Sequence, residues 1–408
     1  MKKILRDNKG SVSALVVISV LLYSIVLTTA FMQASSKRKM QMESQILAKE
    51  AYEKQLDNLD EIRDEINGGA GTKVPAEATA ETAPYFPDNT FTKKEGTIDT
   101  GLVIKDASGN EYVWVVVPRT TAVYKTTGLG KTTFTDADYT SIEKDLKDYT
   151  SIYVTESGYS DLYYPDDKNV GWFADETAYN NLKNSMLKSV YENGGFYVGR
   201  YEAGIGTNRT SKSATNSDGK YTIEGMPTPV TKADAYPYTY VTRTQAQNLA
   251  SNVNSGTKTS SLMFGVQWDL VLAFMHNKGN IADSTLTSNS TTIGNYKNNL
   301  WTIKNANAKY STDYGRTFTA CPNPFKKDAD SKILLTTGAD SSFSVQNIYD
   351  IAGNVYEWTL EKTDRGSLPC AQRGGDFYDT GSGSPAAKRN NFYTFSTDYS
   401  IGFRVTLW

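Results

Sequence analysis

The sequence has few of the residues from which catalytic and metal sites are most often built. Its 408 residues include one histidine, His276, and two cysteines, Cys321 and Cys370. Sites made of several histidines, or of four cysteines, therefore cannot be assembled within one chain. A Ser-His-Asp triad would have to use His276, which follows the largely apolar run 268–275. We expect His276 to lie at the end of a helix, where the helix dipole favours a histidine without any catalytic role.

The sequence also lacks an excess of charge of either sign. Its 43 Lys and Arg residues and 45 Asp and Glu residues give a formal net charge of −2, so neither nucleic acid nor an anionic membrane surface is indicated as a partner. Hydrophobic residues make up 39% of the chain, enough for a packed core. The 27 tyrosines suit wet contact surfaces and ordinary strands alike, so both interpretations stay open.

Residues 11–32 contain no charged side chain. A helix of this length spans roughly 33 Å, enough to cross a bilayer core. We predict a single-pass transmembrane anchor over residues 1–33 in the cell membrane. The short basic segment before it and the long chain after it favour a C-terminal domain outside the cytoplasm. A cleavable signal peptide, with small residues near Ala30 and Ala34, is the alternative.

The same segment is similar to the leaders of prepilins, in which a charged stretch ends in glycine before a hydrophobic helix. Here Gly10 and Ser11 stand at that boundary. Pilins usually carry glutamate at the fifth position after the glycine, where this chain has Leu15. A minor pilin-like structural subunit is therefore kept as an alternative function.

The predicted anchor leads into two further segments before the main domain. Residues 34–67 are rich in strong helix formers, with apolar residues at mostly three- or four-residue steps, which predicts a helical stalk able to self-associate. Residues 68–91 contain glycines and three prolines, which predicts a flexible linker. The large domain is predicted to span residues 92–408.

Short strands and turns dominate the large domain. Segments 102–105 and 111–118 flank a turn, which predicts a hairpin. The run 113–117 is apolar throughout, as in strands covered on both faces. Helices are predicted for 179–191, 242–250 and 267–277. Surface loops are predicted for the polar segments 205–220, 252–260 and 281–300.

Six motifs follow one another in the large domain: GGFYVGRYEA (194–203), PYTYVTRTQA (237–246), LMFGVQWDLVL (262–272), NIYDIAGNVYEWT (347–359), RGG (373–375) and GFRV (402–405). In this order they resemble the formylglycine-generating, or sulfatase-modifying-factor, family over residues 95–408. The resemblance implies an α+β fold, namely an irregular C-type-lectin-like domain with a mostly antiparallel sheet and a few helices. In this chain a long N-terminal transmembrane and stalk helix is expected to precede it.

The fourth motif places turn-forming residues and two carboxylates close together, and clustered oxygen ligands suit calcium. The resemblance implies a structural calcium ion held by a side chain, two backbone carbonyls and a glutamate. By position these ligands are Asp350, Gly353, Val355 and Glu357. The alternative is that the two carboxylates only bond to loop amides.

Active members of the family carry two cysteines shortly after Arg-Gly-Gly, where they bind copper as thiolates. The corresponding positions here are about Asp379 and Ser384, and neither side chain can replace a thiolate for Cu(I). A related iron-dependent branch uses several histidines, which this chain lacks. We therefore predict a non-catalytic domain without copper. A formylglycine-generating oxidase or an iron-dependent oxidoreductase is the alternative.

The two cysteines lie elsewhere in the chain, at Cys321 and Cys370. In an oxidising exterior they could form a disulfide that closes a loop of roughly 50 residues, worth about 3–4 kcal/mol. We predict this disulfide. Two unpaired buried thiols are the alternative.

The segment 381–399 has the composition of a binding surface, being rich in Asn, Tyr, Ser, Thr, Asp and Gly. In the family's fold this segment lines the ligand surface, and in some relatives, the variable proteins of diversity-generating retroelements, it is diversified. Of the residue types that adenine-directed mutation of Asn codons cannot produce, this stretch contains only Lys388. The predicted contact residues are Asp376, Tyr378, Asp379, Asn390, Asn391, Tyr393, Asp398 and Tyr399. We therefore predict a membrane-anchored, surface-displayed, adhesin-like protein that binds an extracellular protein or glycan and no nucleic acid.

Overall fold

The computed structural model describes residues 77–166, 170–211 and 215–408, together with Ser19 and Leu22. The chain divides into two compact units, Met1–Gly68 and Gly69–Trp408. The structure does not test the predicted stalk, the predicted anchor apart from Ser19 and Leu22, or residues 68–76 of the predicted linker, because these lie outside the described residues. Within the described part, no helix has both the length and the apolar character needed to cross a bilayer.

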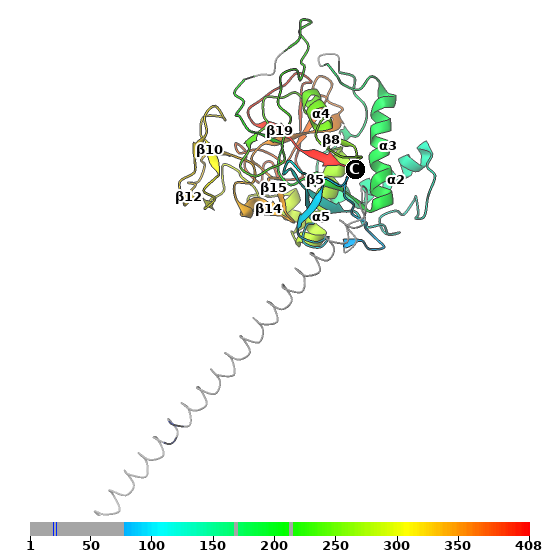
Figure 1. Ribbon diagram of the computed structural model, residues 1–408, viewed down its shortest axis with the longest axis horizontal. Coiled ribbons are helices and arrows are strands. Elements are labelled where there is room, and N and C mark those ends of the chain that lie inside the picture. Colours follow the sequence, from blue (N-terminus) through cyan, green and yellow to red (C-terminus); the bar gives the residue numbers. More distant parts are fainter. Residues whose placement is uncertain (1–18, 20–21, 23–76, 167–169, 212–214) are drawn as a thin grey trace, which may run out of the picture. The chain divides into compact units, whose positions relative to one another are not determined.

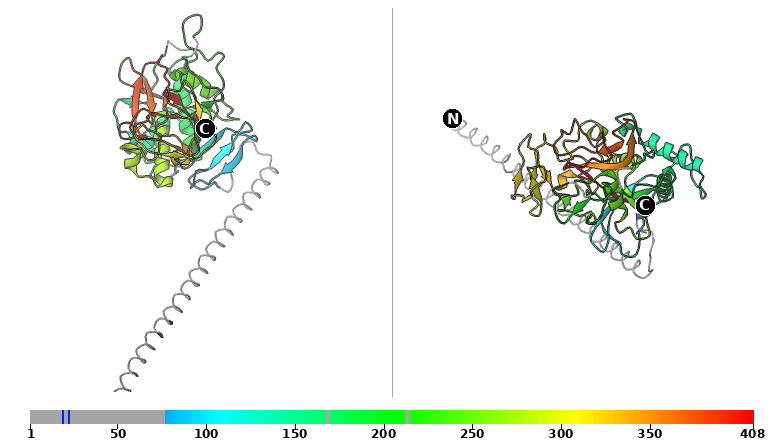
Figure 2. Two further views of the ribbon diagram at one scale, coloured as in Figure 1. Left: turned by 90° about the vertical axis from the view of Figure 1, so that its left-hand side faces the viewer. Right: turned by 90° about the horizontal axis from the view of Figure 1, so that it is seen from above.

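The first of the two main sheets runs through the centre of the domain (Figure 1). Its strands, in spatial order, are β1 (Thr92–Glu95), β2 (Val103–Lys105), β3 (Glu111–Val116), β5 (Gly195–Gly199), β20 (Val405–Leu407) and β8 (Ser260–Leu262). All neighbours in it are antiparallel. β2 and β3 form the predicted hairpin, and β3 is buried over Val113–Val115, which confirms a strand covered on both faces. Figure 2 shows β1 and β2 at the margin of the domain.

The second main sheet brings three motifs side by side. Its centre is β16 (Tyr356–Thr363), with β17 (Cys370–Arg373) antiparallel on one side and β19 (Ile401–Phe403) parallel on the other. β18 (Arg389–Phe392) pairs with β17 at the edge, and β4 (Tyr159–Ser160) pairs with the end of β16. Glu357 on β16 therefore stands opposite Arg373 and also opposite Gly402.

Shorter strand pairs complete the domain, and β10 and β12 among them lie on one flank in Figure 1. The pairs are β6 (Gly204–Ile205) with β7 (Tyr236–Pro237), β9 (Thr302–Ile303) with β12 (Phe325–Lys326), β10 (Lys309–Ser311) with β11 (Thr319–Ala320) and β13 (Leu334–Leu335), and β14 (Ser344–Val345) with β15 (Ile348–Tyr349). A second hydrophobic cluster, which includes Trp301 and Phe343, lies among them. The sequence did not predict these strands, because two or three residues are too few to show a period.

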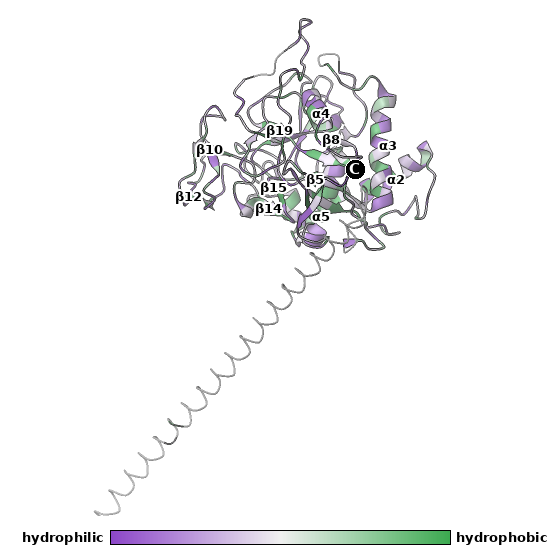
Figure 3. Ribbon diagram, viewed as in Figure 1, coloured by the Kyte–Doolittle hydropathy of each residue, from purple (hydrophilic) through white to green (hydrophobic). Residues whose placement is uncertain are grey.

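The described helices are α2 (Asp136–Tyr149), α3 (Glu176–Asn193), α4 (Arg243–Ser251), α5 (Gly265–Gly279) and α6 (Asp283–Thr287), with the 3-10 turns η2 (Ser151–Tyr153) and η3 (Ser341–Phe343). α3, α4 and α5 confirm the three predicted helices. α3 begins where the Asp175 side chain accepts from the Ala178 amide, and it ends at Gly194 in the left-handed conformation. Along α3, Figure 3 shows apolar and polar residues in alternation, and the helix buries one face.

Two predicted boundaries differ from the structure. Residues 82–91 belong to the domain and not to the linker: the Trp114 indole donates to the Thr82 hydroxyl at 2.8 Å, and the Tyr197 hydroxyl donates to the Tyr85 carbonyl at 2.8 Å. The predicted loop 281–300 contains α6 and the fully buried Tyr296. In both places buried aromatic side chains pack into the domain, although most of the residues around them in the sequence are polar.

His276 lies in the last turn of α5, as predicted. Its Nδ1 is 2.8 Å from the Ile281 carbonyl and 3.2 Å from the Asp283 carboxylate. These contacts fasten the end of α5 to the following turn, which is a structural role.

Candidate functional site

The turn that follows Arg373 depends on two glycines. Gly374 and Gly375 have φ values of 89° and 78°, which side-chain-bearing residues rarely adopt. A Cβ atom on Gly375 would lie 2.5 Å from the Ser384 carbonyl oxygen. The turn therefore brings the start of the segment after β17 against Ser384, which lies eleven residues beyond the end of the strand at Arg373.

Arg373 holds this turn on α5 through a buried network of four charges. Its guanidinium contacts Asp269 at 2.7 Å and Glu361 at 3.3 Å. Arg389 contacts the same two carboxylates at 2.5 and 3.0 Å. Two cations and two anions are thus mutually paired, which is the condition under which buried charges are tolerated.

Asp379 and Ser384, the two positions singled out in the sequence, meet at one tyrosine hydroxyl. The Tyr356 hydroxyl donates to the Asp379 carboxylate at 2.7 Å and lies 2.9 Å from the Ser384 hydroxyl. Tyr356 is buried, and burial, followed by the charge of Asp379, raises its pKa well above the usual value. The structure therefore places residues 379 and 384 together, with a carboxylate and a hydroxyl on the same tyrosine hydroxyl.

Asp376 proves to be a turn residue rather than a ligand contact. It is buried, and its carboxylate accepts from the backbone amides of Tyr378 at 2.8 Å and Asp379 at 3.1 Å. Burial, followed by the charge of Asp379, raises its pKa to about 7. The prediction of Asp376 as a surface contact is wrong, because the turn after Gly375 points its side chain inward.

Two of the predicted contact residues belong to a compact group of rings that we call the tyrosine cluster: Tyr314, Tyr378 and Tyr399. The rings of Tyr314 and Tyr378 are stacked at 5.7 Å, and their hydroxyls are 3.1 Å apart. The Tyr399 ring lies 4.9 Å from that of Tyr314. The Lys332 ammonium sits 3.6 Å from the centroid of Tyr378 and lowers the pKa of its hydroxyl. Tyr314 is 39% exposed, so the cluster presents aromatic surface to the solvent.

The other predicted contacts lie on or after the edge strand β18. Asn390 and Asn391 are half-buried, and the Asn391 amide donates to the Tyr159 hydroxyl at 3.2 Å. Tyr393 and Phe395 are stacked at 5.0 Å and are 41% and 48% exposed. Among the described residues, no ring contact joins this pair to the tyrosine cluster.

The side chain of Asp398 forms hydrogen bonds within its own turn. Its carboxylate accepts from the backbone amide and the hydroxyl of Ser400 at 3.0 and 3.1 Å. The predicted set of contact residues is therefore not one continuous group of free side chains.

Sequence reasoning missed Tyr314, Lys332 and Phe395. Tyr314 lies 64 positions before Tyr378, in a polar stretch without periodicity, so only the tertiary fold brings the two rings together. Its positive φ of 63° marks a turn that presents the ring outward. Phe395 lies inside the predicted segment 381–399, but its apolar ring is not one of the polar residue types that mark a binding surface by composition.

The predicted disulfide is not formed. Cys321 and Cys370 are both free and buried. Cys370 lies in β17 within the main core, whereas Cys321 belongs to the separate cluster around Trp301. Burial raises the pKa of each thiol to about 11. The prediction is wrong because sequence spacing alone does not show on which side of the domain each cysteine packs.

The predicted calcium ligands lie beside a buried arginine. Both oxygens of Glu357 accept from the Arg404 guanidinium, at 2.6 to 3.1 Å. The Asp350 carboxylate accepts from the Gly338 amide at 2.7 Å. Arg404 thus supplies the positive charge that a calcium ion would bring to Glu357.

The backbone around these residues is tightly packed. A Cβ atom on Gly353 would lie 2.3 Å from the Asn295 carbonyl, and the Val355 amide donates to Glu202 at 3.2 Å. In the part of the chain that the structure describes, no three or more His, Cys, Asp or Glu side chains form a group able to hold a metal. Calcium binding at Asp350, Gly353, Val355 and Glu357 stays a prediction.

Comparison with known proteins identifies the domain. Residues 220–407 match the model of the sulfatase-modifying factor enzyme 1-like domain, and the chain therefore carries a domain of the sulfatase-modifying factor family. No curated protein matches the chain.

Three solved structures resemble the chain at low identity. CarF is 14% identical, covering 61% of this chain and 95% of its own, with a TM-score of 0.28. PvdO from Pseudomonas aeruginosa is 17% identical, covering 61% and 91%, with a TM-score of 0.29. Treponema denticola variable protein 1 is 12% identical, covering 83% and 92%, with a TM-score of 0.22.

Proposed function

We propose that this chain is a non-catalytic ligand-binding protein. The observation that carries the proposal is the meeting of Asp379 and Ser384 at the Tyr356 hydroxyl. These two side chains stand where the resemblance puts the copper-binding cysteines of active relatives. A carboxylate and a hydroxyl are hard oxygen ligands, whereas Cu(I) requires soft sulfur ligands.

The chain's own thiols do not replace the missing pair. Cys321 and Cys370 lie in different hydrophobic clusters, and each has a pKa of about 11. At neutral pH both are protonated, and a protonated thiol is neither a good metal ligand nor a nucleophile. This supports a domain that keeps the family's scaffold without its oxidation chemistry.

The tyrosine cluster is the surface that we propose for ligand contact. Tyrosine rings offer broad amphipathic area, and they lose little side-chain entropy on binding because they have only two side-chain torsions. Stacking within the cluster holds the rings in place before a ligand arrives, which lowers the entropic cost further. With Lys332 beside them, they suit an extracellular protein or a glycan with hydroxyl and acidic groups.

The location of the protein is part of the same proposal. The uncharged run 11–32 would anchor the chain in the membrane, with the described domain on the outer side. A structural calcium ion in the loop of Asp350 would add rigidity at the start of β16. The test is antibody labelling of intact cells that express an epitope-tagged chain. A tag on the described domain that the antibody does not reach would contradict this placement.

A finer proposal concerns the segment from β18 to residue 399, which would be the diversified part of a retroelement variable protein. β18 is an edge strand, and Asn390 and Asn391 on it are half-exposed, so substitutions there disturb little packing. A reverse transcriptase gene and a near-copy of the 3′ end in the neighbouring DNA would support this proposal. Their absence from the locus would contradict it.

A direct test of the catalytic side is to incubate the purified chain with copper and a cysteine-containing peptide. We expect no conversion of the peptide cysteine to formylglycine by mass spectrometry, while an active member of the family converts it in parallel. Turnover above the copper-only background would overturn the proposal.

A test of the binding side compares the wild-type chain with a Tyr378→Ser, Tyr399→Ser variant on protein and glycan arrays. We expect the variant to lose the spots that the wild type binds. Leu129→Ser is the matched control, because it removes an exposed apolar side chain outside both the tyrosine cluster and the segment from β18 to residue 399. Equal binding by the wild type and the double variant would place the ligand elsewhere.

A further inference from the structure

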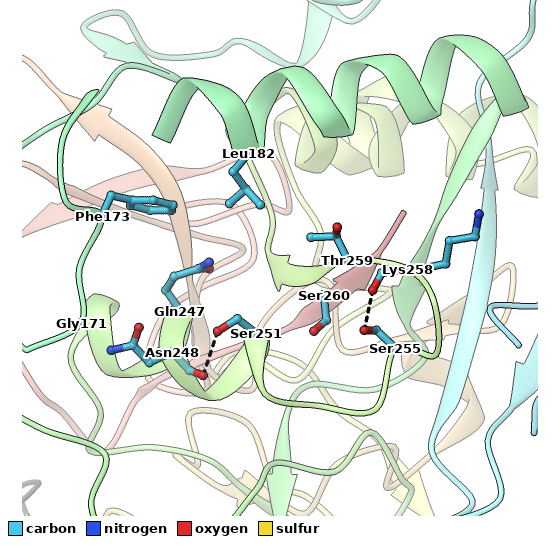
Figure 4. Close-up of a pocket in the computed structure, with 10 residues that line it drawn as sticks. All are labelled: Gly171, Phe173, Leu182, Gln247, Asn248, Ser251, Ser255, Lys258, Thr259 and Ser260. Atoms are coloured by element: carbon cyan, nitrogen blue, oxygen red, sulfur yellow. Dashed lines mark hydrogen bonds between the residues drawn. The ribbon is translucent and has the colours of Figure 1, made fainter. Parts of the chain in front are cut away.

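A pocket of about 370 Å³ lies away from the tyrosine cluster, between α3, α4 and the segment that leads into β8 (Figure 4). This volume falls within the range of small-molecule sites. None of its lining residues belongs to the tyrosine cluster or to the turn after Arg373. The site is thus separate from the surface proposed above.

One wall of the pocket is apolar. It consists of the Phe173 ring and Leu182 of α3. Two edge-to-face contacts fix the ring, with Trp172 at 4.9 Å and with Tyr179 at 5.2 Å. A ring so held offers a preformed flat surface for the C–H face of a ligand.

The opposite wall carries polar groups without partners. The carbonyl oxygen of the Gln247 side chain accepts from the Ser261 hydroxyl and the Leu262 amide, both at 2.9 Å, so its NH₂ group is left without a hydrogen bond to any described residue. Ser260 is only 5% exposed, and its hydroxyl has no partner. The Thr259 hydroxyl, on the same segment, also forms no bond within the described chain. A buried polar group without a partner is costly, and such groups commonly mark a site that a ligand completes.

The remaining polar groups set the charge of the pocket. The hydroxyls of Ser251 and Ser255 donate to backbone carbonyls, as the dashed lines in Figure 4 show. None of the described residues that line the pocket is acidic. Lys258 directs its ammonium away from the pocket, onto the Tyr85 ring at 4.2 Å. A ligand there would meet hydroxyl and amide groups on one side and an aromatic ring on the other, with no charge to balance.

We propose that this pocket binds a neutral pyranose, either free or at the end of a glycan. A pyranose has hydroxyls around its edge, which would pair with Gln247, Thr259 and Ser260. Its C–H face would lie against Phe173. The geometry gives this chain a carbohydrate site independent of any ligand of the tyrosine cluster.

The test uses the full-length chain and a panel of glucose, galactose, mannose and N-acetylglucosamine in saturation-transfer NMR. We expect at least one sugar to bind at concentrations up to about 20 mM. Ser260→Ala and Thr259→Val should each weaken that binding about five-fold, because each removes one hydrogen bond to the ligand. Neither hydroxyl has a protein partner, so both variants should fold like the wild type.

Ser141→Ala is the matched control, because its hydroxyl lies on α2 and donates to the Ala137 carbonyl outside the pocket. Unchanged affinity in this control, with weaker binding in the two pocket variants, supports the proposal. No saturation transfer from any sugar of the panel overturns it. Sugar binding that persists in the pocket variants but disappears in Tyr378→Ser also overturns it, and would instead support the tyrosine cluster as the glycan site.

Discussion

Replacement of Glu357 by glutamine tests how the centre of the domain is held together. Glu357 and Arg404 are both fully buried, and the guanidinium donates to both carboxylate oxygens. Removing one charge from a buried pair typically costs 3–5 kcal/mol, since the other charge is left without compensation. Arg404 would keep its bonds to the Gly199 and Tyr349 carbonyls, at 3.0 and 2.8 Å. The charges of Glu202 and Asp350 also lie close enough to raise the pKa of Arg404.

We therefore expect Glu357→Gln to lower the free energy of unfolding by about 3 kcal/mol, the lower end of that range. Urea unfolding followed by tryptophan fluorescence measures it, since Trp114, Trp268 and Trp358 are buried. Lys144→Ala is the matched control: it breaks an exposed ion pair with Asp148, which water screens, and should leave the free energy of unfolding nearly unchanged. A loss below about 1 kcal/mol for Glu357→Gln would refute the argument that this pair is essential.

Three further predictions follow from the site. Asp376 has a pKa of about 7 in the folded chain, against 3.8 as its ordinary value. Its contribution to stability is therefore complete below pH 4 and is lost as the pH rises through 7, so Asp376→Asn should be more stable than the wild type at pH 8, by up to about 4 kcal/mol in urea unfolding. Equal pH profiles would contradict this. Gly375→Ala should lose at least about 1 kcal/mol, measured in the same way, because its φ is 78°; an unchanged midpoint would show that the turn relaxes. Cys321 and Cys370 should react with Ellman's reagent only after unfolding, and rapid labelling of the native chain would disprove their burial.

The elements with a clear period were predictable from sequence. The hairpin of β2 and β3 and the helices α3, α4 and α5 show regular apolar spacing or turn signals, and all lie where expected. α2 was missed although Thr135 and Asp138 form a capping box, because its apolar face is short and buries mainly Ile142 and Leu146. The strands of two or three residues are stabilised by tertiary contacts and leave no local signal.

Only the part of the candidate site that lies at a known spacing from the six motifs was predictable from the sequence. Asp379 and Ser384 were located by their distance from Arg373, and the structure brings them together at Tyr356. The tyrosine cluster required the position of Tyr314, which nothing in the sequence near Tyr378 indicates. The pairing of cysteines depends on which cluster each thiol joins, and that is a property of the whole fold.

The most direct test of the central claim is a Cu(I) competition titration of the wild-type chain and of the double variant Asp379→Cys, Ser384→Cys. If the scaffold persists and only the sulfur ligands are missing, the wild type should bind no Cu(I) in competition with a colorimetric chelator, and the double variant should bind one equivalent. Tight binding of Cu(I) by the wild type, or no binding by the double variant, would contradict the account.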